Sequence, residues 1–476
     1  MKKESASGAS MLGPGMRDGR RAARNSALNL AGVVIPAALA IIATPVILNN
    51  LGPQGFGIFS LQLAVLVLIG VNDFGISRAM TLEAVAQGGF TSNAELRQVV
   101  WAGIHLITVV AVGVIVIGGS AMTIVTATTP MSMDQQISWA LLIPAAAVSL
   151  VTLPARAALE VQERFALSNS LRTVGSSLLF AGPALATYIE PTMTATSLAM
   201  LGSRVGLSIA SIVATRNLLE RPDWKQFTHV LRGFVSLRAS KLHGRLIRRA
   251  GWLGSAGITS MLIGYVDRFA LGFLATATVI ALYVVPAELV TKMWLVTGAL
   301  TSAVMPRLAH YWRDDGGGQF GRLFNLLLYS QLALVLSAHV IFVFFGEHLL
   351  AIWLGSQYDQ SMSELLAILS IGISVNTISS LNYIVLILHG KERLIAHVQF
   401  VALLLTVIAS LIAGYYYQAA GVAWVFSGRL VVDAFVIRAL VPSSGGKIRS
   451  GVHPSIMLIW LATVLGLYVV AQVSSL

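Results

Sequence analysis

Residues 27–77 read ALNLAGVVIPAALAIIATPVILNNLGPQGFGIFSLQLAVLVLIGVNDFGIS, and no charged side chain occurs between positions 27 and 72. Two apolar runs, 27–48 and 57–77, flank the turn-forming sequence NNLGPQGF at 49–56. A helix needs about 20 mostly apolar residues to cross the hydrocarbon layer of a membrane. The stretch therefore predicts two membrane-spanning helices joined by a short turn.

The same pattern continues along the chain. Of its 476 residues, 56% are hydrophobic and 11% are charged, whereas a soluble protein carries roughly 25% charged residues. So few charges cannot cover the surface of soluble domains, and the absence of cysteine excludes a disulfide scaffold. We predict an all-α polytopic membrane protein with thirteen spans. They are 27–48, 57–77, 98–119, 137–159, 168–189, 194–216, 250–274, 280–305, 323–346, 364–388, 394–415, 418–440 and 455–473.

The positions of lysine and arginine predict the orientation of these spans. The segments that connect the spans on one side, at 49–56, 120–136, 190–193, 275–279, 347–363 and 416–417, contain no Lys or Arg. The basic residues gather on the opposite side and in the N-terminal tail, as in cytoplasmic loops. We therefore expect a cytoplasmic N-terminus. The net charge of +12 is explained by topology and by attraction to anionic lipid, so we do not expect a nucleic-acid partner.

The span order predicts two lobes of six helices around a central cavity. A basic cytoplasmic tail (1–26) precedes an N-lobe (27–216), and a C-lobe (250–440) precedes a linker with an extra C-terminal span (441–476). The connector 217–249 alternates apolar and basic residues at helical spacing, which is typical of an amphipathic helix on the inner leaflet. A solvated basic loop is the alternative. Parallel repeats of this kind are typical of transporters with a substrate path between the lobes.

Ionisable residues within a membrane span are costly and are candidate functional groups. Arg204 lies near the middle of its predicted span, whereas Asp267 and Arg268 lie in the outer third of theirs, close in depth to Glu288. The cations are Arg204, Arg268, Lys292 and Arg429, and the carboxylates are Asp267, Glu288 and Asp433. Glu288 and Lys292 are four residues apart, as are Arg429 and Asp433, so each pair could form an ion pair that only joins helices. Arg204 has no carboxylate within four positions and needs either a partner from another helix or an anionic ligand.

Three amides in the predicted spans have two possible roles. Gln62, Asn376 and Asn382 could contact sugar hydroxyls, or they could form hydrogen bonds between helices.

The sequence shows no pattern typical of an enzyme. It lacks a P-loop and an HExxH motif, and the predicted external loops are too short for a glycosyl-transfer site. We expect no cofactor and no metal. Any energy would come from the substrate gradient or from a proton or sodium gradient, for which Asp267, Glu288 and Asp433 are candidate coupling groups.

Two blocks of the sequence resemble a known family. The first, 29–79, carries Leu51-Gly52, Phe56-Gly57 and Asp73-Phe74-Gly75 in the order found at the start of Wzx-type polysaccharide flippases. These flippases belong to the MATE-like multidrug/oligosaccharidyl-lipid/polysaccharide exporter superfamily. The second block, 266–309, is similar to another of their motifs. It contains Asp267, Arg268, Tyr283, Pro306 and Leu308. The twelve-span layout extends the resemblance over most of the chain, although a thirteenth span departs from the family's usual twelve or fourteen.

This resemblance implies a V-shaped transporter of the bacterial inner membrane. Its substrate would be an undecaprenyl-diphosphate-linked oligosaccharide, moved from the inner to the outer leaflet by alternating access. Inner-membrane lipids, and the polymerase and chain-length proteins of the same pathway, would be its partners. Guanidinium groups can hold a diphosphate bidentately, so Arg204, Arg268, Lys292 and Arg429 are candidates for that role by their depth.

Other functions remain open from the sequence. A cation-coupled drug antiporter of the same superfamily should have an acidic cavity, whereas this chain has four cations against three carboxylates in its spans. A lipid II flippase is a close variant of the main prediction. A membrane-embedded glycan polymerase or ligase is the alternative from another class, and a long outer loop with Arg and His would favour it.

Overall fold

The computed structural model describes residues 14–70, 75–86, 93–216, 241–314, 318–441 and 452–474, and every regular element in these ranges is helical. The first part of the chain forms α1 (Pro14–Gly70), α2 (Ile76–Ala86), α3 (Asn93–Thr128), α4 (Met133–Val161), α5 (Phe165–Ile189) and α6 (Met193–Ala214). The second part forms α9 (Lys241–Ile263), α10 (Val266–Leu274), α11 (Ala277–Thr291), α12 (Met293–Asp314), α13 (Gly318–Phe344), α14 (Gly346–Leu354), the 3-10 turn η1 (Gly355–Gln357), α15 (Gln360–Leu388), α16 (Glu392–Leu440) and α17 (Pro454–Ser474).

Two of these helices are each interrupted by one non-helical residue. Helix α1 breaks at Gly52, whose φ of 68° and ψ of 172° suit a residue without a Cβ. Helix α16 breaks at Gln418, with φ 48° and ψ −128°. Each break falls where the sequence predicts a turn between two spans. Helices α1 and α16 therefore contain two predicted spans each.

The described ranges hold nine helices long and apolar enough to cross a membrane, or ten if the bent pair α9–α10 forms one span. Since α1 and α16 count twice and α5 is 25 residues long, each of the thirteen predicted spans overlaps a helix or a helix pair. Two predicted spans are divided near their middle within the described residues. Span 250–274 bends by 52° between α9 and α10, beside Gly264, and span 280–305 is divided between α11 and α12 at Lys292. Glycine is a common site of such bends.

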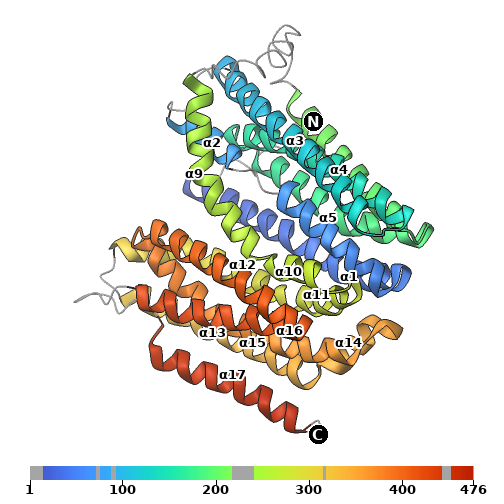
Figure 1. Ribbon diagram of the computed structural model, residues 1–476. Coiled ribbons are helices and arrows are strands. Elements are labelled where there is room, and N and C mark those ends of the chain that lie inside the picture. The colour runs from blue at the N-terminus through green and yellow to red at the C-terminus, as the bar shows by residue number, and fades with distance from the viewer. Residues whose placement is uncertain are drawn as a thin grey trace, which may run out of the picture.

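Figure 1 shows two helix bundles, an N-lobe of α1–α6 and a C-lobe of α10–α17. The bundles meet around α1, α10 and α11 and spread apart toward the other end, where α9 crosses from one to the other (Figure 1). One apolar core continues across the junction, since Ile47 and Phe59 of α1 belong to the same buried cluster as Tyr283 of α11 and Phe426 of α16.

Contacts at both ends of the molecule join the N-lobe to the rest of the chain. At the end predicted to face outward, Gly57 lies so close to Ala277 that an added Cβ would be 1.8 Å from the Ala277 carbonyl oxygen. At the end predicted to face the cytoplasm, Arg245 Nε of α9 donates to Glu83 Oε1 of α2 at 2.9 Å. The connector predicted at 217–249 is described only from residue 241, where it forms the first turns of α9.

The additional C-terminal helix α17 packs against the C-lobe. Trp460 Nε1 donates to the Ser374 carbonyl oxygen at 3.1 Å, and His339 Nε2 lies 3.1 Å from the Val464 carbonyl oxygen. These contacts join α17 to α15 and α13. The predicted thirteenth span is thus an integral helix of the C-lobe bundle.

Candidate functional site

A cluster of three charged side chains lies where the two lobes meet. Arg268 Nη2 of α10 is 2.5 Å from Glu288 Oε1 of α11, and Lys292 Nζ is 2.5 Å from Glu288 Oε2. The side chains of Arg268, Glu288 and Lys292 are 9%, 15% and 21% exposed. One carboxylate is therefore shared by two cations, and the cluster carries a net positive charge.

Local structure explains this geometry. Glu288 and Lys292 face the same way because residues four apart share a helix face, and Lys292 ends α11. Arg268 reaches them because the chain reverses between α10 and α11, where Thr276 caps the start of α11 by accepting the Val279 amide. The Glu288–Lys292 ion pair expected from the sequence is thus present, with Arg268 added from the neighbouring helix.

The N-lobe covers one side of this cluster. A small cleft there has a volume of about 10 Å³, which is at the lower limit for a single water molecule. Phe56, Phe59 and Ser60 of α1 line it together with Arg268 and Glu288. The cleft is therefore too small for a ligand larger than water, and Lys292 is the most exposed member of the cluster.

Asp267 is held by two donors within the C-lobe. Its Oδ1 accepts the backbone amide of Arg268 at 2.8 Å, and its Oδ2 accepts the Tyr283 hydroxyl at 2.7 Å. The side chain of Tyr283 is fully buried and Asp267 is 9% exposed. This carboxylate is therefore fixed in place beside the cluster.

Arg429 and Asp433 lie on α16, one turn apart, but the described residues show no ion pair between them. Asp433 accepts hydrogen bonds from Ser379 and Tyr383 of α15, both at 2.8 Å, and from Gln399 at 3.1 Å. The Arg429 guanidinium lies over the Phe426 ring, 5.7 Å from its centroid, and its Nε has no hydrogen-bond partner among the described residues. Ser379 and Tyr383 of α15 thus bind the Asp433 carboxylate, which the helix spacing alone would pair with Arg429.

Arg204 lies apart from the other candidate residues. It is on α6, which packs against α4 and α5 inside the N-lobe, and it is 5% exposed. Within the described ranges, its Nε and Nη2 atoms are buried without a hydrogen-bond partner. The structure therefore separates Arg204 from the cluster at the lobe junction and leaves it without a protein counterion in the part of the chain that is described.

The three predicted sugar-contacting amides form hydrogen bonds between helices. Gln62 Nε2 donates to Ser138 Oγ at 2.6 Å in the N-lobe core. Asn376 Oδ1 accepts the Trp294 indole N–H at 2.9 Å, and Asn382 Oδ1 accepts the Val452 amide at 3.0 Å. Gln62 and Asn382 are fully buried. In this conformation these hydrogen bonds stabilise helix packing, whereas Asn382 Nδ2 is buried without a partner among the described residues.

Comparison with known proteins assigns the family. Residues 22–312, more than half of the chain, match the family of polysaccharide biosynthesis proteins. The chain belongs to this family. A relative from Shigella flexneri named "Putative O-antigen transporter" is 24% identical over 423 residues, which are 88% of this chain and 97% of the relative.

Solved structures of low sequence identity share the fold of this polysaccharide biosynthesis protein. An inward-facing multidrug resistance MATE family transporter of the MOP superfamily aligns with a TM-score of 0.64 and 13% identity, over 92% of this chain and 98% of its own. The lipid II flippase MurJ, in an inward closed conformation, aligns with a TM-score of 0.61 and 12% identity, over 96% and 98%. The chain is thus a polytopic membrane protein with a MATE-like fold.

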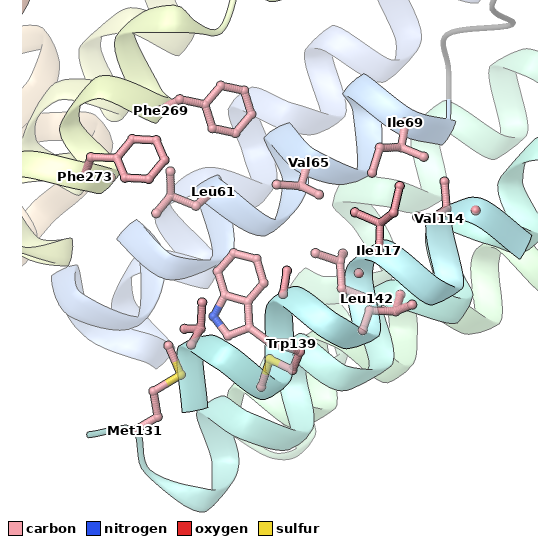
Figure 2. A pocket seen from close by; sticks show the side chains of 18 of the residues that line it. Leu61, Val65, Ile69, Val114, Ile117, Met131, Trp139, Leu142, Phe269 and Phe273 are labelled. Carbon is pink, nitrogen blue, oxygen red and sulfur yellow. The ribbon is translucent and has the colours of Figure 1, made fainter. Parts of the chain in front are cut away.

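Sequence reasoning missed one large feature of this family member. A cavity of about 760 Å³ lies between α1, α3 and α4 of the N-lobe and α10 of the C-lobe (Figure 2). Its lining contains no charged side chain. No local pattern in the sequence indicates such a cavity, because its walls come from four helices that are distant in the chain.

The described residues include no group of three or more His, Asp or Glu that could hold a metal ion.

Proposed function

We propose that this protein moves a polyprenyl-diphosphate-linked oligosaccharide across the bacterial inner membrane by alternating access, and that it is a transporter without catalytic activity. The observation that carries the proposal is the Arg268–Glu288–Lys292 cluster at the lobe junction, where two cations share one carboxylate. A diphosphate is the part of such a lipid that is most costly to bring into the membrane, and paired cations reduce that cost.

Lys292 is the proposed first contact for the diphosphate. It is the most exposed residue of the cluster, at 21%, and its flexible stem can turn the ammonium group from Glu288 toward an incoming phosphate. Arg268 would then continue to neutralise Glu288. Arg429 and Arg204 are proposed further contacts, since both have buried guanidinium nitrogens without partners among the described residues.

The family and the relative from Shigella flexneri support a substrate of this class. The topology proposed for this function has a cytoplasmic N-terminus, and the polymerase and chain-length proteins of the same pathway are proposed partners. Asp267, Glu288 and Asp433 are the proposed groups for coupling to a proton or sodium gradient. Gln62 Nε2 and the Oδ1 atoms of Asn376 and Asn382 would contact sugars only in a conformation that breaks their present hydrogen bonds.

Reconstituted vesicles test the proposal directly. Purified protein is placed in liposomes that contain a fluorescent polyprenyl-diphosphate oligosaccharide, and the fraction accessible to an external quencher is followed over time. We expect translocation by the wild-type protein and about tenfold slower translocation by Lys292→Gln, since a charge-assisted contact contributes roughly 1.5–3 kcal/mol. Lys391→Gln, which removes the same charge near the start of α16, is the matched control.

Two outcomes would count against the proposal. If wild-type protein moves no lipid-linked oligosaccharide but exports small cationic drugs, the protein is an antiporter of the multidrug type. If Lys292→Gln and Lys391→Gln both move the lipid at the wild-type rate, the cluster is not the diphosphate site. Size-exclusion profiles of the variants show whether a lost rate reflects lost folded protein.

A further inference from the structure

The cavity between the N-lobe and α10 is lined by aliphatic and aromatic side chains. Figure 2 shows Trp139 of α4 and Phe269 and Phe273 of α10 arranged around it, with Leu61 and Val65 of α1 along another wall. Its volume of about 760 Å³ is within the range of small-molecule binding sites, roughly 300–1,000 Å³. Aromatic and aliphatic walls without charge select a hydrocarbon ligand over a polar one.

The cavity lies in the half of the membrane predicted to face outward. Its α3 wall continues to Val125, three residues before α3 ends, and its α4 wall begins at Trp139, soon after α4 starts at Met133. Both ends lead into the 129–132 connection, on the side without Lys or Arg. Neighbouring α3 side chains such as Val116 and Ile124 are 60% and 64% exposed. The cavity wall is thus continuous with a surface that faces lipid.

The cavity and the charged cluster share two helices. On α10, Arg268 belongs to the cluster and the next residue, Phe269, lines the cavity. On α1, Ser60 lines the small cleft at the cluster and the next residue, Leu61, lines the cavity. The cluster and the cavity therefore lie on adjacent faces of α1 and α10.

We propose that this cavity binds part of the isoprenoid chain of the polyprenyl carrier while the diphosphate is at the cluster. The inference rests on the proposed function. When the phosphate group of the lipid lies at the lobe junction, its isoprenoid chain extends beyond the midplane of the membrane. There the cavity provides an apolar surface in the outer half of the membrane. An ordinary phospholipid keeps its headgroup at the membrane surface and cannot occupy both places, so the two adjoining sites select the polyprenyl lipid.

Glycines in the cavity wall provide a variant that fills the cavity without disturbing the helices. A Cβ added at Gly113 on α3 would meet no atom within 4 Å, so Gly113→Leu extends into the open space. Gly119, six residues further along α3, is equally unobstructed but does not line the cavity. Gly119→Leu is therefore a matched control for any effect of leucine on α3.

The test uses two photoreactive probes in the same proteoliposomes. One is a polyprenyl diphosphate with a diazirine in its isoprenoid chain, and the other is a phosphatidylglycerol with a diazirine in one acyl chain. We expect the polyprenyl probe to label peptides of α3 and α10. Gly113→Leu should reduce this labelling about tenfold, because each lost CH₂ contact weakens binding and a loss of 1.4 kcal/mol corresponds to a tenfold lower affinity. Labelling of Gly119→Leu should equal that of the wild type.

The outcomes separate this inference from the proposed function. Equal labelling of α3 and α10 by both probes would show a bulk-lipid groove and overturn the inference, as would polyprenyl labelling that Gly113→Leu leaves unchanged. Translocation of the fluorescent oligosaccharide lipid is measured in parallel. If the wild type moves that lipid while the cavity is not labelled by the polyprenyl probe, the inference fails and the function stands. If the wild type moves none, the function fails whatever the labelling shows.

Discussion

Arg204→Met should make the ligand-free protein more stable while impairing transport. Arg204 lies near the middle of α6 and is 5% exposed, and its Nε and Nη2 atoms have no partner in the described part of the chain. A buried charge without a counterion is a cost in the folded state. Methionine keeps an unbranched stem of similar reach and removes the charge, so packing changes little.

The expected size of the stabilisation follows from the depth of the Arg204 side chain in the membrane. Position 204 is the twelfth of the 22 residues of α6, so about 17 Å of helix precede it at 1.5 Å per residue. At the centre of a membrane helix an arginine costs about 2.5–3.5 kcal/mol on insertion scales. We expect Arg204→Met to raise the free energy of unfolding by about 2–3 kcal/mol. The same substitution removes the attraction for a diphosphate, so translocation in liposomes should slow.

Arg268→Met is the matched variant with the opposite expected sign. Arg268 donates to Glu288 at 2.5 Å, and loss of a charge-assisted hydrogen bond costs roughly 1.5–3 kcal/mol. Reversible unfolding in mixed detergent micelles, followed by tryptophan fluorescence, measures both variants. Destabilisation of Arg204→Met by an amount similar to that of Arg268→Met would refute the reasoning, because it would show that Arg204 has a stabilising protein partner.

Three further outcomes test the fold. Gly57→Ala should lower stability by about 1–3 kcal/mol, since its Cβ would overlap the Ala277 carbonyl. Gly113→Ala is the control and should leave stability unchanged. Equal losses of stability in the two variants would contradict the close contact between the lobes at Gly57. Glu83→Gln removes the ion pair between α2 and α9 and should lower stability by about 1.5–3 kcal/mol, because the Glu83 side chain is only 3% exposed. It should also broaden the distance distribution between spin labels on these two helices, and an unchanged distribution would contradict the role of this ion pair. A cysteine at Ile189, the last residue of α5 and 86% exposed, should react with an impermeant maleimide on intact cells. Labelling only after permeabilisation would reverse the predicted topology.

The positions of the helices could be predicted because the membrane requires long apolar runs. Each of the thirteen predicted spans overlaps a helix or a helix pair. The breaks within spans could not be predicted. The bend between α9 and α10 occurs beside Gly264, and this residue is one of 43 glycines in the chain. Whether a glycine bends a helix depends on what the two halves pack against, and α9 contacts the N-lobe while α10 belongs to the C-lobe.

The candidate site was predictable only where partners lie on one helix. Helix spacing correctly pairs Glu288 with Lys292, but it equally favours a pair of Arg429 with Asp433 that the described structure does not contain. Tyr383 from α15 binds Asp433 instead. Spacing along one helix gives the direction of a side chain, whereas its partner is decided by the neighbouring helices, which a single sequence does not define.

The balance of charge differs between the lobes in a way that suits a carrier of an anionic lipid. In the C-lobe, the candidate cations Arg268, Lys292 and Arg429 are matched in number by the carboxylates Asp267, Glu288 and Asp433. The N-lobe candidate is Arg204, which has no counterion in the described part of the chain. Helix α6 packs mainly against α4 and α5, and the carboxylates of α4 are occupied near its ends, where Asp134 accepts the Thr194 amide and Glu160 pairs with Arg156. A diphosphate bound near Arg204 would supply a counterion for the buried guanidinium. Binding would therefore stabilise the loaded protein relative to the empty one. Binding energy of this kind can shift the population of conformations, because a ligand shifts an equilibrium by its difference in affinity for the two states.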